Sequence, residues 1–178
     1  MASRIVLMCG LSGAGKTTYA ATLVEQGWQR LSIDEYIFAR YGVFGVDFDE
    51  SEWILFQVEA DAHVRTQLIE LIGLGRDIVV DLSFWNRAMR DEFKQLVESQ
   101  GASWDLVYIK VDPAVLPGRL ALRRERPGAD AFPIEPEMLA RFIAGFEAPD
   151  GEGETVIEVA QFDPKSRRRV GSRAPLNG

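Results

Sequence analysis

The amino-acid sequence predicts an α/β protein built on a parallel β-sheet with helices on both faces. Apolar, strand-like segments alternate along the chain with longer segments suited to helices, which is the order of repeated βαβ units. The 178 residues are enough for one domain with a full hydrophobic core. A glycine-rich turn separates the first apolar segment from the first helical one, and this arrangement is typical of a phosphate-binding loop.

The first half of the chain contains two expected strands and three expected helices. The strands cover about 4–9 and 28–33, and the helices cover about 16–26, 36–40 and 50–74. Gly27 and Gly75 end two of these helices, because glycine readily takes up the left-handed conformation found at helix ends. Asp49 can cap the long helix, since its side chain can accept hydrogen bonds from the first free N–H groups.

The second half continues the alternation. Strands are expected over about 77–81, 104–111 and 155–159, and helices over about 86–100, 113–126 and 137–147. The pair Asp112-Pro113 is suited to a helix start, and the stretch 127–136, which contains proline and glycine, interrupts two helices. We divide the chain into a domain over 1–164 and a tail over 165–178, which carries four arginines, has little to bury and is expected to be flexible.

The composition indicates a globular protein of the cytoplasm. Hydrophobic residues make up 47% of the chain and charged residues 26%, and no apolar run reaches the length of a membrane span. The chain opens directly with a strand rather than a signal peptide. Its single cysteine, Cys9, cannot form an internal disulfide, which fits a reducing compartment, and we expect it to be buried. The net charge of −7 argues against binding to nucleic acid or to anionic membranes.

Residues 10–17 read G-x-x-x-x-G-K-T, the Walker A pattern of a phosphate-binding loop. Its glycines let the backbone curl so that successive N–H groups point at phosphate oxygens, and the helix that follows adds partial positive charge. The side chain of Lys16 would reach the β and γ phosphates, and the hydroxyl of Thr17 would bind Mg²⁺. The loop residues expected to bind a nucleoside triphosphate are Gly10, Ser12, Gly13, Ala14, Gly15, Lys16, Thr17 and Thr18. The alternative is a structural glycine turn with an incidental lysine.

Two aspartates end expected strands on the rim where open α/β sheets bind their ligands. Asp34 follows the second strand and is the candidate base that takes the proton from an alcohol acceptor. Its alternative role is that of a cap for the next helix. Asp81 follows the third strand and would hold Mg²⁺ or orient the substrate, with a cap for the following turn as its alternative. Such carboxylates beside a phosphate loop are typical of phosphoryl transfer.

Four arginines cluster on the helix that leads into the stretch 127–136, namely Arg119, Arg123, Arg124 and Arg126. Arg119 and Arg123 share a helix face, and guanidinium groups suit phosphate oxygens. We therefore expect a lid over about 119–137, in which Arg119 binds the nucleotide and Arg123 takes part in catalysis. Arg124 and Arg126 fit a solvated helix end better. Arg87 is a candidate contact for the substrate or the transferred phosphoryl group, and Arg90 is expected on the surface.

Aromatic residues gather near both ends of the expected long loop and after the third strand. Those expected to include core members are Phe44, Phe48, Trp53, Phe84 and Trp85. Because Phe84 and Trp85 directly follow a strand on the functional rim, they form either an apolar wall for the substrate or part of the core. His63, the single histidine, is expected to be structural or at the surface.

Four motifs together resemble the P-loop kinase family. They read G-L-S-G-A-G-K-T-T at 10–18, S-I-D at 32–34, V-V-D-L-S-F-W-N-R at 79–87 and R-L-A-L-R at 119–123. The chain is most similar to the group of small AAA-domain kinases, whose relatives include gluconate kinase, shikimate kinase, zeta toxin, chloramphenicol phosphotransferase and 5′-polynucleotide kinase. The resemblance covers about residues 4–160. It implies a five-stranded parallel P-loop sheet with a small helical lid, and transfer of the γ-phosphoryl group of ATP to a small acceptor.

The resemblance also assigns roles at matching positions. Lys16 and Thr17 would hold phosphate and Mg²⁺, Asp34 would be the aspartate that activates the acceptor, and Arg123 would be the lid arginine. We therefore expect a kinase that uses ATP and Mg²⁺ to phosphorylate a hydroxyl of a small molecule, such as a sugar, an aminocyclitol or an antibiotic.

Two departures from the family pattern bear on the acceptor. Ile37 stands where polynucleotide kinases often have an arginine, and Leu82-Ser83-Phe84 replaces a frequent Ala-Thr-Asn. Both changes make the acceptor site less polar and weaken the nucleic-acid interpretation. The alternatives are a polynucleotide or nucleotide-sugar hydroxyl kinase, and an ATPase switch that acts on a protein partner. The sequence has no N-K-x-D guanine motif, which argues against a GTPase switch, and it leaves the oligomeric state open.

Overall fold

The chain folds around one five-stranded sheet in which every pair of neighbouring strands is parallel. The computed structural model describes residues 3–124, 128–129 and 134–159. The strand order is β2-β3-β1-β4-β5. The strands are β1 (Arg4–Cys9), β2 (Gln29–Leu31), β3 (Ile78–Val80), β4 (Ser103–Val111) and β5 (Glu154–Val159). The expected α/β fold with a five-stranded parallel sheet is therefore confirmed.

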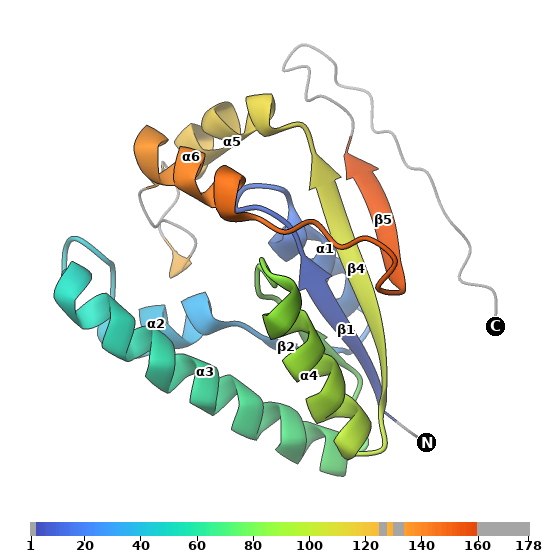
Figure 1. Cartoon of the computed structure of the whole chain (residues 1–178). Coiled ribbons are helices and arrows are strands. Elements are labelled where there is room, and N and C mark those ends of the chain that lie inside the picture. The colour runs from blue at the N-terminus through green and yellow to red at the C-terminus, as the bar shows by residue number, and fades with distance from the viewer. Residues whose placement is uncertain (1–2, 125–127, 130–133, 160–178) are drawn as a thin grey trace.

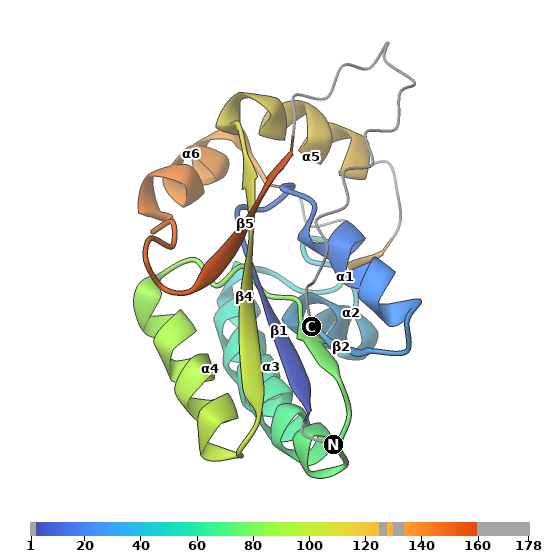
Figure 2. The same ribbon diagram turned by 90° about the vertical axis from the view of Figure 1, so that its right-hand side faces the viewer.

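Helices cover both faces of this sheet (Figures 1 and 2). They are α1 (Lys16–Val24), α2 (Ile33–Tyr41), α3 (Glu50–Gly73), α4 (Arg87–Ser99), α5 (Leu116–Arg124) and α6 (Pro136–Gly145), with a 3₁₀ turn η1 (Pro113–Val115) before α5. Successive side chains of β1 point to opposite faces, as a strand requires. Ile5 and Leu7 pack into the cluster that contains Val64 of α3, whereas Val6 and Met8 pack with α1. One apolar cluster therefore lies on each face of the sheet, which gives a layer of helices, the sheet and a second layer of helices.

The second strand and the second helix differ from their expected bounds for one local reason. The side chain of Ser32 accepts a hydrogen bond from the Glu35 backbone N–H at 3.3 Å, and it thereby caps a helix that begins at Ile33. The helix therefore starts three residues before the expected position and shortens the strand. Asp34 lies in its first turn, so the alternative role of Asp34 as helix cap is wrong.

The long helix α3 begins where the sequence predicts. The side chain of Asp49 accepts a hydrogen bond from the Ser51 backbone N–H at 2.8 Å, and Glu52 completes a capping box by accepting from the Asp49 backbone N–H at 3.3 Å. This cap fixes the point at which the loop 42–49 enters the helix. The loop is consequently held beside α2 rather than left free.

Arg90 is completely buried, so the expectation that it lies on the surface is wrong. Its guanidinium group donates to both carboxylate oxygens of Glu152, at 2.8 and 2.6 Å. It also donates to the backbone oxygens of Phe84 at 2.9 Å and Glu147 at 2.8 Å. Lys94 donates to the same carboxylate at 3.2 Å. These hydrogen bonds, which we call the Arg90–Glu152 clasp, connect the segment after α6 to α4 and to the backbone that follows β3.

The expected division of the chain extends beyond the described residues. The tail 165–178 and parts of the expected lid, at 125–127 and 130–133, lie outside them. The described part of the lid consists of most of α5, Gly128-Ala129 and the start of α6. Helices α5 and α6 lie above the carboxyl ends of the strands (Figure 1). Among residues 3–124, 128–129 and 134–159, no helix combines the length and apolar character that a membrane span requires.

Candidate active site

The loop between β1 and α1 has the backbone shape of a phosphate cradle. Gly10, Gly13 and Gly15 have positive φ angles of 145°, 81° and 112°, which side-chain-bearing residues rarely adopt. A Cβ atom at Gly10 would lie only 2.8 Å from the backbone oxygen of Ile109. Gly15 caps α1 without a side chain that bonds to the first helical amides. The loop therefore fits a bound polyphosphate, because its curled glycine backbone leads into the start of α1, where helix N–H groups favour anionic oxygens.

Lys16 lies within the electrostatic reach of both candidate carboxylates. Its ammonium group donates to the backbone oxygens of Gly10 at 2.9 Å and Leu11 at 3.0 Å. Burial is the larger effect and lowers the pKa of Lys16, and the negative charges of Asp81 and Asp34 partly offset it by raising that pKa. The structure thus brings the expected lysine and the two expected aspartates to one rim of the sheet.

Both arginines that we assigned to the triphosphate contact the phosphate loop. Arg119 donates to the backbone oxygens of Ala14 at 3.1 Å and Gly13 at 3.4 Å. Arg123 donates to the hydroxyl of Ser12 at 3.4 Å. Helix α5 therefore presents two guanidinium groups to the loop, four residues apart on one face. The side chain of Arg124 and all of Arg126 lie outside the described residues.

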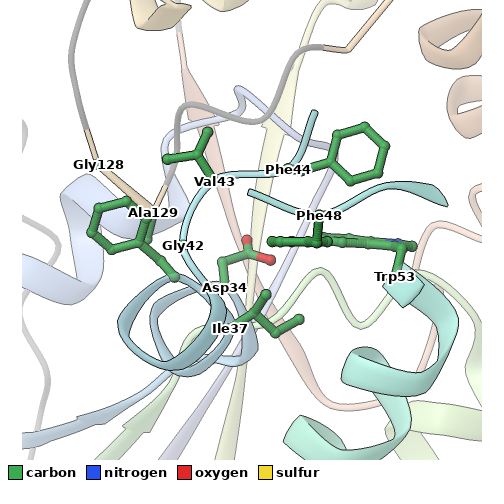
Figure 3. Close-up of a pocket in the computed structure, with 10 residues that line it drawn as sticks. Asp34, Ile37, Gly42, Val43, Phe44, Phe48, Trp53, Gly128 and Ala129 are labelled. Atoms are coloured by element: carbon green, nitrogen blue, oxygen red, sulfur yellow. The ribbon is translucent and has the colours of Figure 1, made fainter. Parts of the chain in front are cut away.

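Asp34 lines a pocket on the other side of the rim (Figure 3). Its carboxyl group points into the space between the aromatic residues of the loop and α3 and the lid segment 128–129. The pocket is lined by Asp34, Ile37, Phe38, Gly42, Val43, Phe44, Phe48, Trp53, Gly128 and Ala129. The aromatic residues of this loop thus belong to a pocket wall as well as to the core, which sequence reasoning did not separate.

Asp81 is buried directly after β3 and forms an ion pair with Arg30 of β2. The Nε and Nη2 atoms of Arg30 lie 2.9 and 2.7 Å from the same atom, Oδ2 of Asp81. Arg30 also pairs with Glu35 of α2. Sequence reasoning missed Arg30, although its place opposite Val79 in the parallel register brings it beside the end of β3. This ion pair orients Asp81 toward the rim.

The remaining candidates lie farther from the loop. The side chain of Arg87 is 62% exposed and lies 3.6 Å from the Asp91 carboxylate, with no described contact to residues 10–18. Phe84 is buried and packs edge-on against Phe93 at 4.9 Å, which places it in the core. Trp85 is half exposed. His63 is exposed against the ring of Tyr36, as expected of a structural or surface residue.

Cys9 at the end of β1 is expected to react slowly. Its thiol is buried and donates to the backbone oxygen of Phe84 at 3.4 Å, and burial raises the pKa of this thiol to about 11, from an ordinary value near 9.0. The thiolate fraction at pH 8 is therefore about 100-fold lower than in the unfolded chain. We expect alkylation by iodoacetamide at pH 8 to be at least about 100-fold slower for the folded protein than in urea, measured by mass spectrometry. Equal rates would contradict this burial.

Together, the cradle, the lysine and the two lid arginines on a parallel sheet define a P-loop protein of the kinase type. The chain belongs to the family of AAA domains, which it matches over residues 5–149. The expected resemblance to P-loop kinases of this group is thereby confirmed. No curated protein is similar enough in sequence to count as a relative.

Three solved structures illustrate the shared fold. A candidate kinase from Chloroflexus aurantiacus is 18% identical with a TM-score of 0.69, and the alignment covers 89% of this chain and 85% of that one. A gluconokinase from Sinorhizobium meliloti is 21% identical with a TM-score of 0.58, covering 90% and 84%. The APS kinase of Mycobacterium tuberculosis in complex with AMPPNP and APS is 16% identical with a TM-score of 0.56, covering 90% of each chain. At these identities the similarity establishes the fold.

Proposed function

We propose that the protein is a kinase that transfers the γ-phosphoryl group of ATP to a hydroxyl of a small molecule. The observation that carries the proposal is that a donor half-site and an acceptor half-site lie on the same rim of the sheet. The phosphate loop with Lys16 and the lid arginines forms one half, and the pocket lined by Asp34 forms the other. The charge of Asp34 acts on Lys16, and this supports a site in which donor and acceptor groups lie together.

The donor half supplies positive groups for the charge that develops during transfer. Lys16 and the loop amides would hold the β and γ phosphates, and Arg119 and Arg123 would contact them from the lid. Each of the two arginines already contacts the loop, so little rearrangement is required before they act. The AMPPNP complex of the structurally similar APS kinase supports ATP as the donor.

Mg²⁺ would be held by the hydroxyl of Thr17 and the carboxylate of Asp81, which are the oxygen ligands that this ion prefers. Both contacts from Arg30 fall on Oδ2 of Asp81. The described residues contain no group of three or more histidine, cysteine, aspartate or glutamate side chains that could hold a metal ion. This fits an ion bound by few protein ligands together with phosphate oxygens, where it neutralises the charge of the triphosphate.

Among the described residues that line the pocket, Asp34 is the side chain suited to proton transfer. Asp34 is exposed and lines the pocket, and a carboxylate in hydrogen-bond reach of an alcohol can orient it and take its proton. The net charge of −7 and Ile37 in the pocket wall support a small molecule over a nucleic acid. We therefore place the phosphoryl acceptor between Asp34 and the phosphate loop.

Asp34→Asn is expected to lower phosphoryl transfer by roughly 10²–10⁴-fold, because the amide cannot accept the proton of the alcohol. The affinity for ATP should stay within about threefold of the wild type, since the loop and the lid arginines are unchanged. Transfer is measured with γ-labelled ATP and a panel of alcohols, and nucleotide affinity by calorimetry.

Glu35→Gln is the matched control, because Glu35 is the neighbouring carboxylate on α2 but lies outside the pocket lining. Its pair with Arg30 is exposed, the amide oxygen can still accept a hydrogen bond from Arg30, and the pair between Arg30 and Asp81 is unchanged. We expect this variant to retain more than about a third of the wild-type rate, as is usual for surface substitutions. Normal transfer in Asp34→Asn would exclude Asp34 as the base. Equal losses in both variants would show that α2 acts through its structure alone.

A further inference from the structure

The aromatic pocket beside Asp34 carries an inference about the acceptor, which rests on the kinase function proposed above. We infer that the acceptor of this protein presents a flat apolar ring close to its reacting hydroxyl and carries no anionic group there. The walls of the pocket, its rigidity, its charge and its size each support this inference.

Four aromatic residues line the pocket, and three of them, Phe44, Phe48 and Trp53, form one cluster that we call the wall (Figure 3). Phe48 and Trp53 lie nearly parallel, with ring centroids 6.1 Å apart and an interplanar angle of 6°. Phe44 stands edge-on to both, at 5.8 Å from Phe48 and 5.5 Å from Trp53. Phe48 is buried, whereas Phe44 and Trp53 are only half-buried. The rings of Phe44 and Trp53 therefore leave part of their apolar surface exposed at the pocket. Such a surface favours stacking or edge-on contact with another aromatic ring.

The loop that carries this wall is already ordered. The Asp47 carboxylate accepts a hydrogen bond from the Val43 backbone N–H at 2.7 Å, and the Gly45 N–H donates to the Phe48 backbone oxygen at 2.8 Å. Gly42 has a φ angle of 88°, and a Cβ at this position would collide with Asp47. The backbone therefore holds Phe44 and Phe48 in place before any ligand binds, which limits the entropy that binding must overcome.

The charge of the pocket disfavours an anionic acceptor. Among the described residues that line it, Asp34 is the single ionisable group, and the lining includes no lysine, arginine or histidine. The sequence from 41 to 64, which forms the loop and the first half of α3, also contains no lysine or arginine. A carboxylate or phosphate on the acceptor would lie beside the Asp34 carboxylate, and the described pocket lining offers no cationic side chain to balance it. Lys16 is a cation whose charge acts on Asp34, but it belongs to the phosphate loop and would be engaged by the triphosphate.

The size of the pocket indicates which part of the acceptor enters it. The pocket is partly open to solvent, and its inner space of about 20 Å³ holds a group of about the size of one water molecule. The pocket therefore suits the hydroxyl itself, and we expect the ring that bears it to rest on the half-buried Phe44 and Trp53. This geometry favours an arylalkanol over a polyol, whose other hydroxyls would lose their water against the aromatic wall.

Four alcohols separate the effects of ring and charge. They are benzyl alcohol, 4-(hydroxymethyl)benzoate, glucose and gluconate, which vary ring and carboxylate independently. We expect kcat/KM for benzyl alcohol to exceed that for each of the other three by at least about 10-fold. Faster transfer to glucose, gluconate or 4-(hydroxymethyl)benzoate would overturn the inference while leaving the kinase function intact. Transfer to none of a wider panel of alcohols would overturn the kinase function itself.

Two variants test the wall directly. Trp53→Ala should raise KM for benzyl alcohol about 10-fold while KM for ATP stays unchanged, and Leu55→Ala, an exposed position on the same helix, is the control. Phe44→Lys retains Trp53 and adds a cation, so it should shift the preference toward 4-(hydroxymethyl)benzoate by at least about 10-fold. An unchanged KM in Trp53→Ala, or an unchanged preference in folded Phe44→Lys, would overturn the inference.

Discussion

Lys16→Ala is expected to lower phosphoryl transfer by at least about 10²–10³-fold, which is the usual effect of removing one cation or donor from a site of developing charge. The backbone amides of the loop remain in this variant, but they leave the charge on the β and γ phosphates without the half-buried ammonium group as counter-ion. Lys16 donates to two backbone oxygens of the loop, so its loss also removes two contacts that shape the cradle. Transfer is followed with γ-labelled ATP, and nucleotide binding by calorimetry.

Lys110→Ala is the matched control for this variant. Lys110 lies on β4 and is more than half exposed, and its ammonium group pairs with Glu158 at 2.9 Å. Such surface pairs contribute at most about 1 kcal/mol to stability, so transfer should stay close to the wild type. Turnover by Lys16→Ala within threefold of Lys110→Ala would contradict the assignment of residues 10–17 as the donor site.

Arg90→Met should destabilise the fold by about 3–5 kcal/mol, since it leaves Glu152 buried without its main partner. The hydrogen bond from Arg90 is the largest cause that holds the pKa of Glu152 below its usual range. Lys94 remains within 3.2 Å of this carboxylate, but it cannot reproduce the paired geometry of a guanidinium group. The free energy of unfolding is measured by urea titration followed by circular dichroism.

Arg76→Met is the control, because Arg76 is exposed near the opposite end of the sheet. We expect its free energy of unfolding to lie within about 0.5 kcal/mol of the wild type. Arg90→Met/Glu152→Met should recover part of the loss, since it removes the unpaired acid together with the arginine. A loss below about 1 kcal/mol in Arg90→Met alone would show that the clasp adds little to stability.

The sequence was sufficient for the parts of the molecule that depend on local pattern. The Walker A spacing located the loop at 10–17, and the four-residue spacing of Arg119 and Arg123 identified the two side chains that contact it. The alternation of apolar segments predicted the sheet, because β1, β3 and the middle of β4 are mostly buried and apolar side chains of β2 and β5 pack against the same clusters. Asp49 as the cap of α3 was likewise a local signal.

The errors arose where a long-range contact overrides a local pattern. Arg90 appeared to be a surface arginine on an amphipathic helix, but its partner Glu152 is 62 residues away and could not be identified from spacing. Arg30 was missed for the same reason, since Asp81 is 51 residues away. Ser32 rather than Asp34 caps α2, because both residues are good caps and the choice depends on where the chain leaves the sheet.

The central claim is that the protein passes a phosphoryl group to an alcohol rather than to water. The most direct test counts both products of one reaction, with labelled ATP and benzyl alcohol at saturating concentration. We predict one phosphorylated alcohol for each ADP formed, with ADP formation in the absence of alcohol at least about 10-fold slower. Release of inorganic phosphate at the same rate with every alcohol and without alcohol would contradict the claim and identify the protein as an ATPase.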